Sequence, residues 1–141
     1  MEKLGSFILD HWILSFALVF VSILLVSETL KRRMLGFKEV SPSDAIRHIN
    51  KDDAVVLDVR EDKEYAEGHI ADALHIPVGV IDKRLQELES YKSKPVIVYC
   101  RSGDRAARAS AILRKQGFES VYKLNGGILA WKAANLPVSK K

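Results

Sequence analysis

The chain has a single cysteine among its 141 residues, and no internal repeat or low-complexity tract is apparent in it. One cysteine cannot form an intrachain disulfide, so a disulfide-stapled scaffold is excluded and a reducing compartment fits the composition. Charge of one sign is not in large excess, because the formal net charge is only +4. Part of that excess lies beside one hydrophobic segment, so the sequence gives no reason to predict nucleic-acid binding.

What is present is an ordinary share of hydrophobic residues, 48%, in a length that suits one compact domain. Short apolar runs alternate with helical patterns after the first 40 residues. Strands are predicted at residues 54–59, 73–76, 96–99 and 121–124. Helices are predicted at residues 42–50, 61–68, 80–91, 105–116 and 127–135. This alternation predicts a three-layer α/β domain with a mainly parallel sheet.

The longest apolar run covers residues 12–30 and is followed by Lys31, Arg32 and Arg33. At about 1.5 Å per residue such a helix is just long enough to cross a bilayer core. A cleaved signal peptide fits less well, since acidic residues precede the run and no small-x-small cleavage pattern follows it. A buried helix of a soluble domain fits less well because the run is apolar on all sides. We therefore expect one transmembrane helix that is retained as an anchor.

The distribution of basic residues around this run predicts its orientation. Lys31, Arg32, Arg33 and Lys38 follow the run, whereas only Lys3 precedes it. The positive-inside rule then leaves the C-terminal part in the cytoplasm, below the inner (plasma) membrane. The expected organisation is an anchor with a basic flank at 1–33, a linker at 34–38, one α/β domain at 39–138 and a basic tail at 139–141.

The single cysteine, Cys100, follows a predicted buried strand and precedes an alanine-rich helix. The carboxyl ends of parallel strands are where open α/β sheets bind ligands. Gly103 permits a tight turn whose backbone N–H groups face inward, and the next helix points its positive end at the same place. Arg101 and Arg105 add positive charge on either side, so we expect a thiolate at Cys100. The alternative is a small buried hydrophobic cysteine, which has no use for these neighbours.

Several motifs in this region and around it resemble those of the rhodanese (sulfurtransferase) family. The resemblance covers residues 37–138 and rests on motifs in the family's order: Leu57-Asp-Val-Arg-Glu61, Glu64-Tyr65, Gly68-His-Ile70, Cys-Arg-x-Gly-x-Arg at 100–105, Asn125-Gly-Gly127 and Trp131. It implies that Cys100 takes sulfane sulfur from a donor, holds it as a persulfide and passes it to a thiol or cyanide.

The resemblance also implies the roles of the site residues. Cys100 would be catalytic, and the substrate-binding loop would consist of Arg101, Ser102, Gly103, Asp104 and Arg105. Neither a cofactor nor a metal is expected. The expected partners are a small sulfur donor, a thiol acceptor, the membrane and a membrane protein beside the anchor.

Two loop positions depart from the family's commonest pattern. Asp104 stands where a neutral Asn is frequent, and its carboxylate should oppose an anionic donor such as thiosulfate. Ala106 stands where Ser is common, which removes one hydroxyl donor from the start of the helix. Both departures bear on which donor is preferred.

Other polar residues admit a structural and a functional interpretation. Asp58 and Arg60 end the strand beside the nucleophile strand and could support the site, but a structural ion pair, with Glu64 as a further partner, is the preferred interpretation. His69 and His75 lack the ligand spacing of a zinc site and fit the family's scaffold better.

Two other functions remain open. A phosphatase or arsenate reductase would also surround an oxyanion with a cysteine and an arginine. Phosphatase loops of this kind need five residues between the two, however, and only four separate Cys100 from Arg105. The other is a non-enzymatic, membrane-tethered binding module. The intact cysteine argues against this function, whereas the unusual Asp104 is compatible with it.

Overall fold

A computed structural model describes residues 1–34 and 36–141 and divides the chain into two compact units, Met1–Leu35 and Gly36–Lys141. Leu35, which belongs to the predicted linker, lies outside the described residues. The side chains of Arg32 and Arg33 are not described either, so Lys31 is the residue of the predicted basic flank whose side chain the structure describes.

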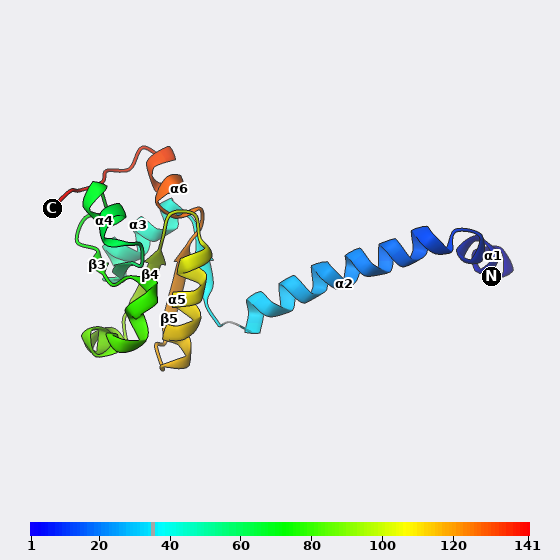
Figure 1. Cartoon of the computed structure of the whole chain (residues 1–141), viewed down its shortest axis with the longest axis horizontal. Helices are drawn as coiled ribbons and strands as arrows, with labels where there is room; N and C mark the ends of the chain where they lie inside the picture. The colour runs from blue at the N-terminus through cyan, green and yellow to red at the C-terminus, as the bar shows by residue number, and fades with distance from the viewer. Residues whose placement is uncertain (35) are drawn as a thin grey trace. The chain divides into compact units, whose positions relative to one another are not determined.

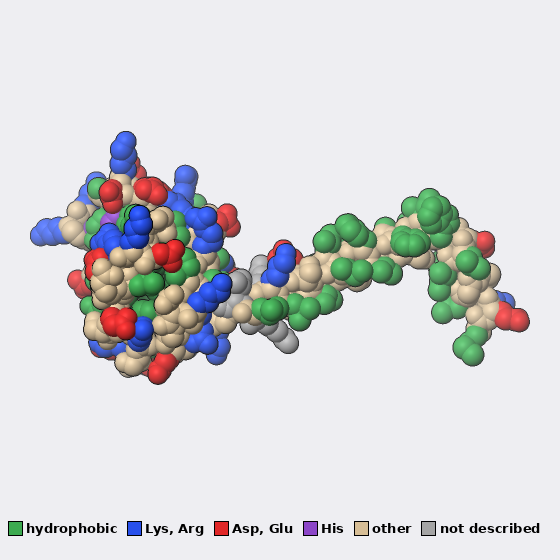
Figure 2. Space-filling view, turned by 60° about the horizontal axis from the view of Figure 1, so that its bottom comes forward, with side chains coloured by type: hydrophobic (Ala, Val, Ile, Leu, Met, Phe, Trp, Pro, Cys, Tyr) green, Lys and Arg blue, Asp and Glu red, His purple; other side chains and the backbone are tan. Residues whose placement is uncertain are grey.

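The first unit consists of two helices, α1 (Glu2–Asp10) and α2 (Trp12–Met34). Helix α1 is an addition to the predicted elements, whereas α2 covers the predicted apolar run. Hydrophobic side chains cover α2 (Figure 2), and the hydroxyls of Ser22 and Thr29 donate to backbone carbonyls one turn earlier. Within the described residues, one helix is long and apolar enough to cross a membrane, at Trp12–Lys31.

The second unit is built around a five-stranded sheet in the order β1-β5-β4-β2-β3, with every neighbouring pair parallel. Its strands are β1 (Lys38–Val40), β2 (Val55–Asp58), β3 (Leu74–His75), β4 (Pro95–Tyr99) and β5 (Ser120–Leu124). Its helices are α3 (Pro42–Lys51), α4 (Asp62–Glu67), α5 (Asp104–Lys115) and α6 (Gly127–Ala133), with 3-10 helices η1 (Val78–Lys83) and η2 (Leu85–Tyr91). Helical crossovers between parallel strands give the predicted α/β architecture (Figure 1).

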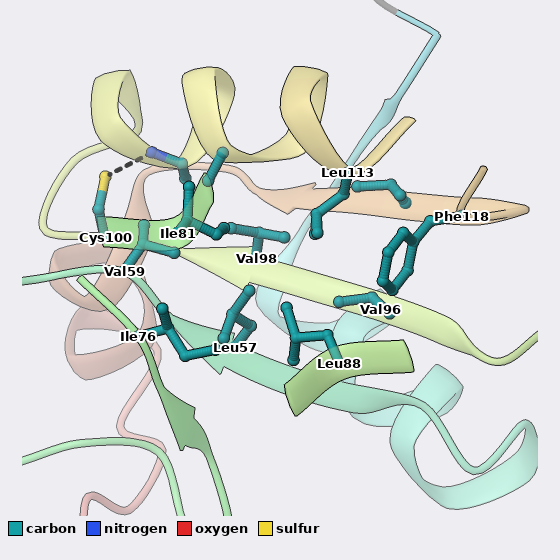
Figure 3. Close-up of a cluster of buried hydrophobic side chains, with 13 residues drawn as sticks. Leu57, Val59, Ile76, Ile81, Leu88, Val96, Val98, Cys100, Leu113 and Phe118 are labelled. Atoms are coloured by element: carbon teal, nitrogen blue, oxygen red, sulfur yellow. Dashed lines mark hydrogen bonds between the residues drawn. The ribbon is translucent and has the colours of Figure 1, made fainter. Parts of the chain in front are cut away.

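Two hydrophobic clusters cover the two faces of the sheet, and β4 contributes to both. Val96 and Val98 belong to the cluster beneath α5, η1 and η2, whereas Ile97 and Tyr99 belong to the cluster beneath α3 and α6. Successive side chains of a strand point to opposite faces, so the next residue, Cys100, falls on the α5 side. Figure 3 shows this first cluster with Cys100 at one end of it.

Helix α3 begins as predicted. Ser41 is its N-cap, the Ser41 hydroxyl accepts a hydrogen bond from the Asp44 N–H at 3.2 Å, and Pro42 is the first helical residue. This arrangement satisfies one of the N–H groups that the start of a helix leaves without a backbone partner.

The prediction of one amphipathic helix over residues 80–91 is wrong. The chain forms the two 3-10 helices η1 and η2 there, separated at Arg84, whose φ of −117° is not helical. Ile81 and Leu88 are nevertheless fully buried in the core. The apolar spacing therefore identified the buried face correctly, although packing selected a tighter backbone than the period implied.

Strand β1 is a second difference from the predictions. It begins at Lys38, within the predicted linker, and pairs with β5 in parallel. Only Val40 of its three residues is buried.

Candidate active site

Cys100 directly follows β4, and two backbone N–H groups donate hydrogen bonds to its sulfur. The nitrogen of Gly103 lies 3.1 Å from Sγ and that of Ala106 lies 3.4 Å away. The side chain is 1% exposed and joins the hydrophobic cluster beside Val59 and Ile81 (Figure 3). Burial alone would suit a structural cysteine, but two convergent donors make this sulfur the acceptor of an anion-binding loop.

The local sequence explains this geometry. Gly103 has a φ of +145°, which side-chain-bearing residues rarely adopt, and this turn brings its N–H back toward the sulfur. Because α5 begins at Asp104, the Ala106 N–H is among those at the start of the helix that have no partner within it. The sulfur thus occupies the place of an anion at a helix N-terminus.

The other loop residues predicted for substrate binding differ in their exposure to solvent. Arg101, Ser102 and Asp104 are exposed, and Gly103 is buried. The structure therefore brings Cys100, Gly103 and the start of α5 together, and places the charged side chains of Arg101 and Asp104 at the solvent side of the loop.

The opposite side of the loop is held by the start of α6. The N–H of Ile128 donates to the Cys100 carbonyl at 2.9 Å, and the N–H of Leu129 donates to the Arg101 carbonyl at 3.4 Å. Gly127 makes this approach possible, since a Cβ there would lie 2.4 Å from the Arg101 oxygen and 2.5 Å from the Cys100 oxygen. Two helix starts thus fix one loop, α5 through the sulfur and α6 through the carbonyls.

Arg105 pairs with Glu64 of α4, and its electrostatic interaction with Cys100 is weaker than that with Glu64. Its two terminal nitrogens donate to the two carboxylate oxygens of Glu64 at 2.6 and 3.0 Å. This bidentate hydrogen bond lowers the pKa of Glu64 to about 2 and raises the pKa of Arg105. The pair ties the first turn of α5 to α4.

Arg60 pairs with Asp58, as the structural interpretation predicts, whereas Glu64 hydrogen-bonds to Arg105 and interacts with Arg60 only through its charge. Arg60 donates to both oxygens of Asp58, with a shortest distance of 2.7 Å, and to the carbonyl of Gly68, also at 2.7 Å. Burial is the largest single influence and lowers the pKa of Arg60, but the hydrogen bonds and charge of Asp58, together with Tyr99, outweigh it and raise the pKa overall. Since both side chains are buried, the pair fixes the chain after β2.

Lys123 of β5 is a neighbour of the loop that the sequence analysis does not predict. Its ammonium nitrogen lies 3.1 Å from Oε1 of Glu39 in β1, and only 15% of its side chain is exposed. The same nitrogen lies 3.4 Å from the place that a Cβ on Gly103 would occupy. One feature of the sequence could have placed Lys123 near the loop. Side chains alternate along β5, which puts Lys123 on the same face as the buried Val121, beneath α5.

The family profile of the rhodanese-like domain matches residues 41–134, a range that contains the loop, both helix starts and the Asp58–Arg60 and Glu64–Arg105 ion pairs. The chain belongs to the rhodanese-like family.

Relatives of this rhodanese-like protein differ in how much of the chain they share. The uncharacterized protein YibN of Escherichia coli is 34% identical over 139 residues, which cover 98% of this chain and 97% of YibN. The thiosulfate sulfurtransferase GlpE of Coxiella burnetii is 38% identical over 97 residues, 69% of this chain and 89% of GlpE. The crystal structure of a rhodanese-related protein from Thermoplasma volcanium, 30% identical, superposes with a TM-score of 0.68 over 74% of this chain and 100% of that one.

Two histidines of the rhodanese-like domain, His69 and His75, hold its scaffold together. The two ring nitrogens of His69 lie 2.9 Å from the Tyr65 carbonyl and 2.6 Å from the Lys141 carbonyl. Nε2 of His75 lies 2.8 Å from the Arg60 carbonyl, and the Tyr65 ring stacks on both histidine rings. Within the part of the chain that the structure describes, no group of His, Cys, Asp and Glu could hold a metal ion.

The chemistry that the loop offers follows from these contacts. Backbone N–H groups donate hydrogen bonds to a negatively charged sulfur and do not transfer their protons to it, so they stabilise the charge. The nucleophilic form of a cysteine is its thiolate. The loop is therefore suited to nucleophilic attack by Cys100.

Proposed function

We propose that this protein is a membrane-anchored sulfurtransferase that carries sulfane sulfur as a persulfide on Cys100. The observation that carries the proposal is the pair of backbone N–H groups, from Gly103 and Ala106, directed at the cysteine sulfur. In the first step the Cys100 thiolate attacks the outer sulfur of the donor. A sulfur–sulfur bond forms on Cys100 while the bond between the outer sulfur and the rest of the donor breaks, and its electron pair leaves with the donor remainder.

In the second step an acceptor thiolate or cyanide attacks the outer sulfur of the persulfide. The sulfur–sulfur bond on Cys100 breaks, its electron pair returns to Cys100, and the thiolate is restored. No external oxidant or reductant is consumed, because the sulfane sulfur is passed on in the same oxidation state. The backbone of the predicted loop residues, Arg101 to Arg105, would surround the transferred sulfur, with Asp58 and Arg60 supporting the strand end beside it.

The membrane part of the proposal rests on α2. Its apolar stretch, Trp12–Lys31, has the length of a membrane span, and the basic residues after it favour a cytoplasmic C-terminal domain. Residues 1–33 would form the anchor, 34–38 the linker, 39–138 the sulfurtransferase domain and 139–141 a basic tail. Tethering would hold the persulfide near a membrane-bound acceptor and raise its effective concentration there.

The proposed function is tested by comparing the wild type with Cys100→Ser in a steady-state assay with cyanide or a thiol as acceptor. We expect transfer by the wild type and none by Cys100→Ser, while both unfold in one transition at similar temperatures. Transfer by the serine variant at the wild-type rate would refute the role of Cys100. A folded wild type that transfers no sulfur from any donor would support the binding module instead.

A further inference from the structure

The positively charged side chains around the active loop are largely neutralised by carboxylates. Arg105 is bidentate with Glu64, and Arg60 is paired with Asp58. Lys123 adds a third pair, with Glu39. At the solvent side of the loop, the exposed residues Arg101 and Asp104 carry charges of opposite sign. Each of the three ion pairs has no net charge, so Arg105, Arg60 and Lys123 do not act on the loop as isolated positive charges.

The Glu39–Lys123 pair lies close enough to the sulfur to influence what binds there. The Gly103 nitrogen is 3.1 Å from Sγ, and the Cβ position of Gly103 is 3.4 Å from the ammonium nitrogen of Lys123. With about 2.5 Å between the nitrogen and Cβ of one residue, Lys123 lies no further than about 9 Å from the sulfur. Because this side chain is mostly buried, water screens its charge less than at an exposed site.

Without Glu39, Lys123 would present an uncompensated positive charge at the base of the loop, which is what a dianionic donor such as thiosulfate requires. With Glu39 in place, that attraction is cancelled. An organic persulfide, R–S–SH or its anion R–S–S⁻, carries at most one negative charge and so depends less on such an attraction; R–S–SH is the form that is attacked. Cys100–S⁻ attacks the outer sulfur, Cys100–S–SH forms with the proton still on that sulfur, and R–S⁻ leaves with the electron pair.

We propose that the Glu39–Lys123 ion pair is a specificity determinant of the active loop, which disfavours dianionic donors and selects organic persulfides as the sulfur donors of this protein. The inference rests on the proposed sulfurtransferase function and names its donor class. Glu39 and Lys123 act here as positioning residues, through the charge that they leave at the loop, and make no contact with the reacting sulfur.

The test uses the full-length protein, with thiosulfate as the dianionic donor and 2-hydroxyethyl persulfide as a donor that carries at most one negative charge. Lys123→Gln should lower kcat/KM for thiosulfate, and Glu39→Gln should raise it, each by about three- to tenfold, as expected for one charge acting on a dianion at this distance. The double variant should return to within about twofold of the wild type, because its net charge is unchanged. With the persulfide, whose charge is at most half that of thiosulfate, all three variants should stay within about twofold.

Two controls separate charge from structure. Lys123→Arg keeps the positive charge and, unlike Lys123→Gln, should show the wild-type preference between the two donors. Lys94→Gln breaks the Lys94–Asp53 pair, which precedes β4 at the opposite end of the strand from Cys100, and should leave the preference unchanged.

The possible outcomes are distinct. Opposite effects of the two single variants on thiosulfate alone, together with a wild-type preference for the persulfide, support the inference. Parallel losses with both donors, or a wild-type preference for thiosulfate, overturn it and leave the proposed sulfurtransferase function standing. A wild type that accepts sulfur from neither donor overturns both.

Discussion

Gly127 sets the distance between the active loop and the start of α6. Its φ of +59° and the two carbonyl oxygens within 2.5 Å of its Cβ position leave no room for a side chain. The loop carbonyls can therefore approach the N–H groups of α6 only if this residue is glycine.

We expect Gly127→Ala to lower the free energy of unfolding by about 2 kcal/mol or more, because the new methyl group must displace backbone atoms. Sulfur transfer should fall with it, since the same shift moves Cys100. Chemical denaturation and steady-state kinetics measure the two effects. Gly79→Ala is the matched control, because a Cβ there meets no atom within 4 Å. Equal stability of the two variants would contradict the role given to Gly127.

Asp104 carries a negative charge at the solvent side of the loop, in the first turn of α5. Asp104→Asn should raise kcat/KM for thiosulfate by about two- to fivefold, because it removes repulsion of an anionic donor. Asp72→Asn, which changes an exposed aspartate outside the loop, should have no such effect. Turnover that stays the same or falls at matched thiosulfate concentration would count against this electrostatic role.

The sequence predicts the parts of the site that are local in the chain. Cys100, Gly103 and the start of α5 lie within seven consecutive residues, and their geometry follows from a strand, a turn and a helix in succession. The partners of Arg105 and Lys123 could not be predicted in this way. Glu64 lies 41 residues before Arg105, and only the folded sheet and helices bring such charges together.

Among the elements, α4 and α5 are joined by the Glu64–Arg105 pair, and this pair should make stability depend on pH. Glu64 has a pKa of about 2 in the folded protein, against an ordinary value of 4.5. The unfolded chain therefore takes up this proton at a higher pH than the folded chain does. The contribution of the pair is fully present above about pH 4.5 and is lost as the pH falls toward 2.

Glu64→Gln should accordingly cost about 1 kcal/mol of unfolding free energy at pH 7, a value that allows for solvent screening of a partly exposed pair. The difference from the wild type should shrink between pH 4.5 and 2. Urea unfolding at a series of pH values measures it. Glu67→Gln, at the exposed end of the same helix, should run parallel to the wild type throughout. A Glu64→Gln difference that does not change with pH would contradict the prediction.

Element by element, the sequence predicts strands and capped helices better than short tight helices. Strands β2, β4 and β5 follow from apolar runs, and α3 follows from its Ser-Pro start. The failure at 80–91 has a physical cause, because apolar residues spaced three and four apart fit one face of an α-helix as well as two short 3-10 turns. Strand β1 was not predicted because its three residues, of which one is buried, are too few to show an alternation of apolar and polar residues.

At the scale of the whole molecule, the two units should be separable by function. The full-length protein should sediment with membranes and resist carbonate extraction, because α2 would cross the bilayer. Deletion of residues 1–33 should release a soluble domain that keeps its transfer activity on small donors, since the loop and its supporting elements all belong to the second unit. Fractionation and kinetics on both forms measure this.

Protease protection completes that test. In spheroplasts, whose plasma membrane is sealed and accessible from outside, added protease should leave the C-terminal domain uncut. Its digestion would contradict the cytoplasmic orientation, and extraction of the full-length protein by carbonate would contradict the anchor.

The central claim is that Cys100 carries the sulfur, and intact-mass spectrometry tests it most directly. After exposure to donor and removal of the excess, the wild-type protein should gain about 32 Da, the mass of one sulfur atom, on the peptide that contains Cys100. Addition of a thiol acceptor should remove the added mass, and Cys100→Ser should never acquire it. A wild-type protein that transfers sulfur while its mass stays unchanged, or a Cys100→Ser protein that gains the same mass, would contradict the account.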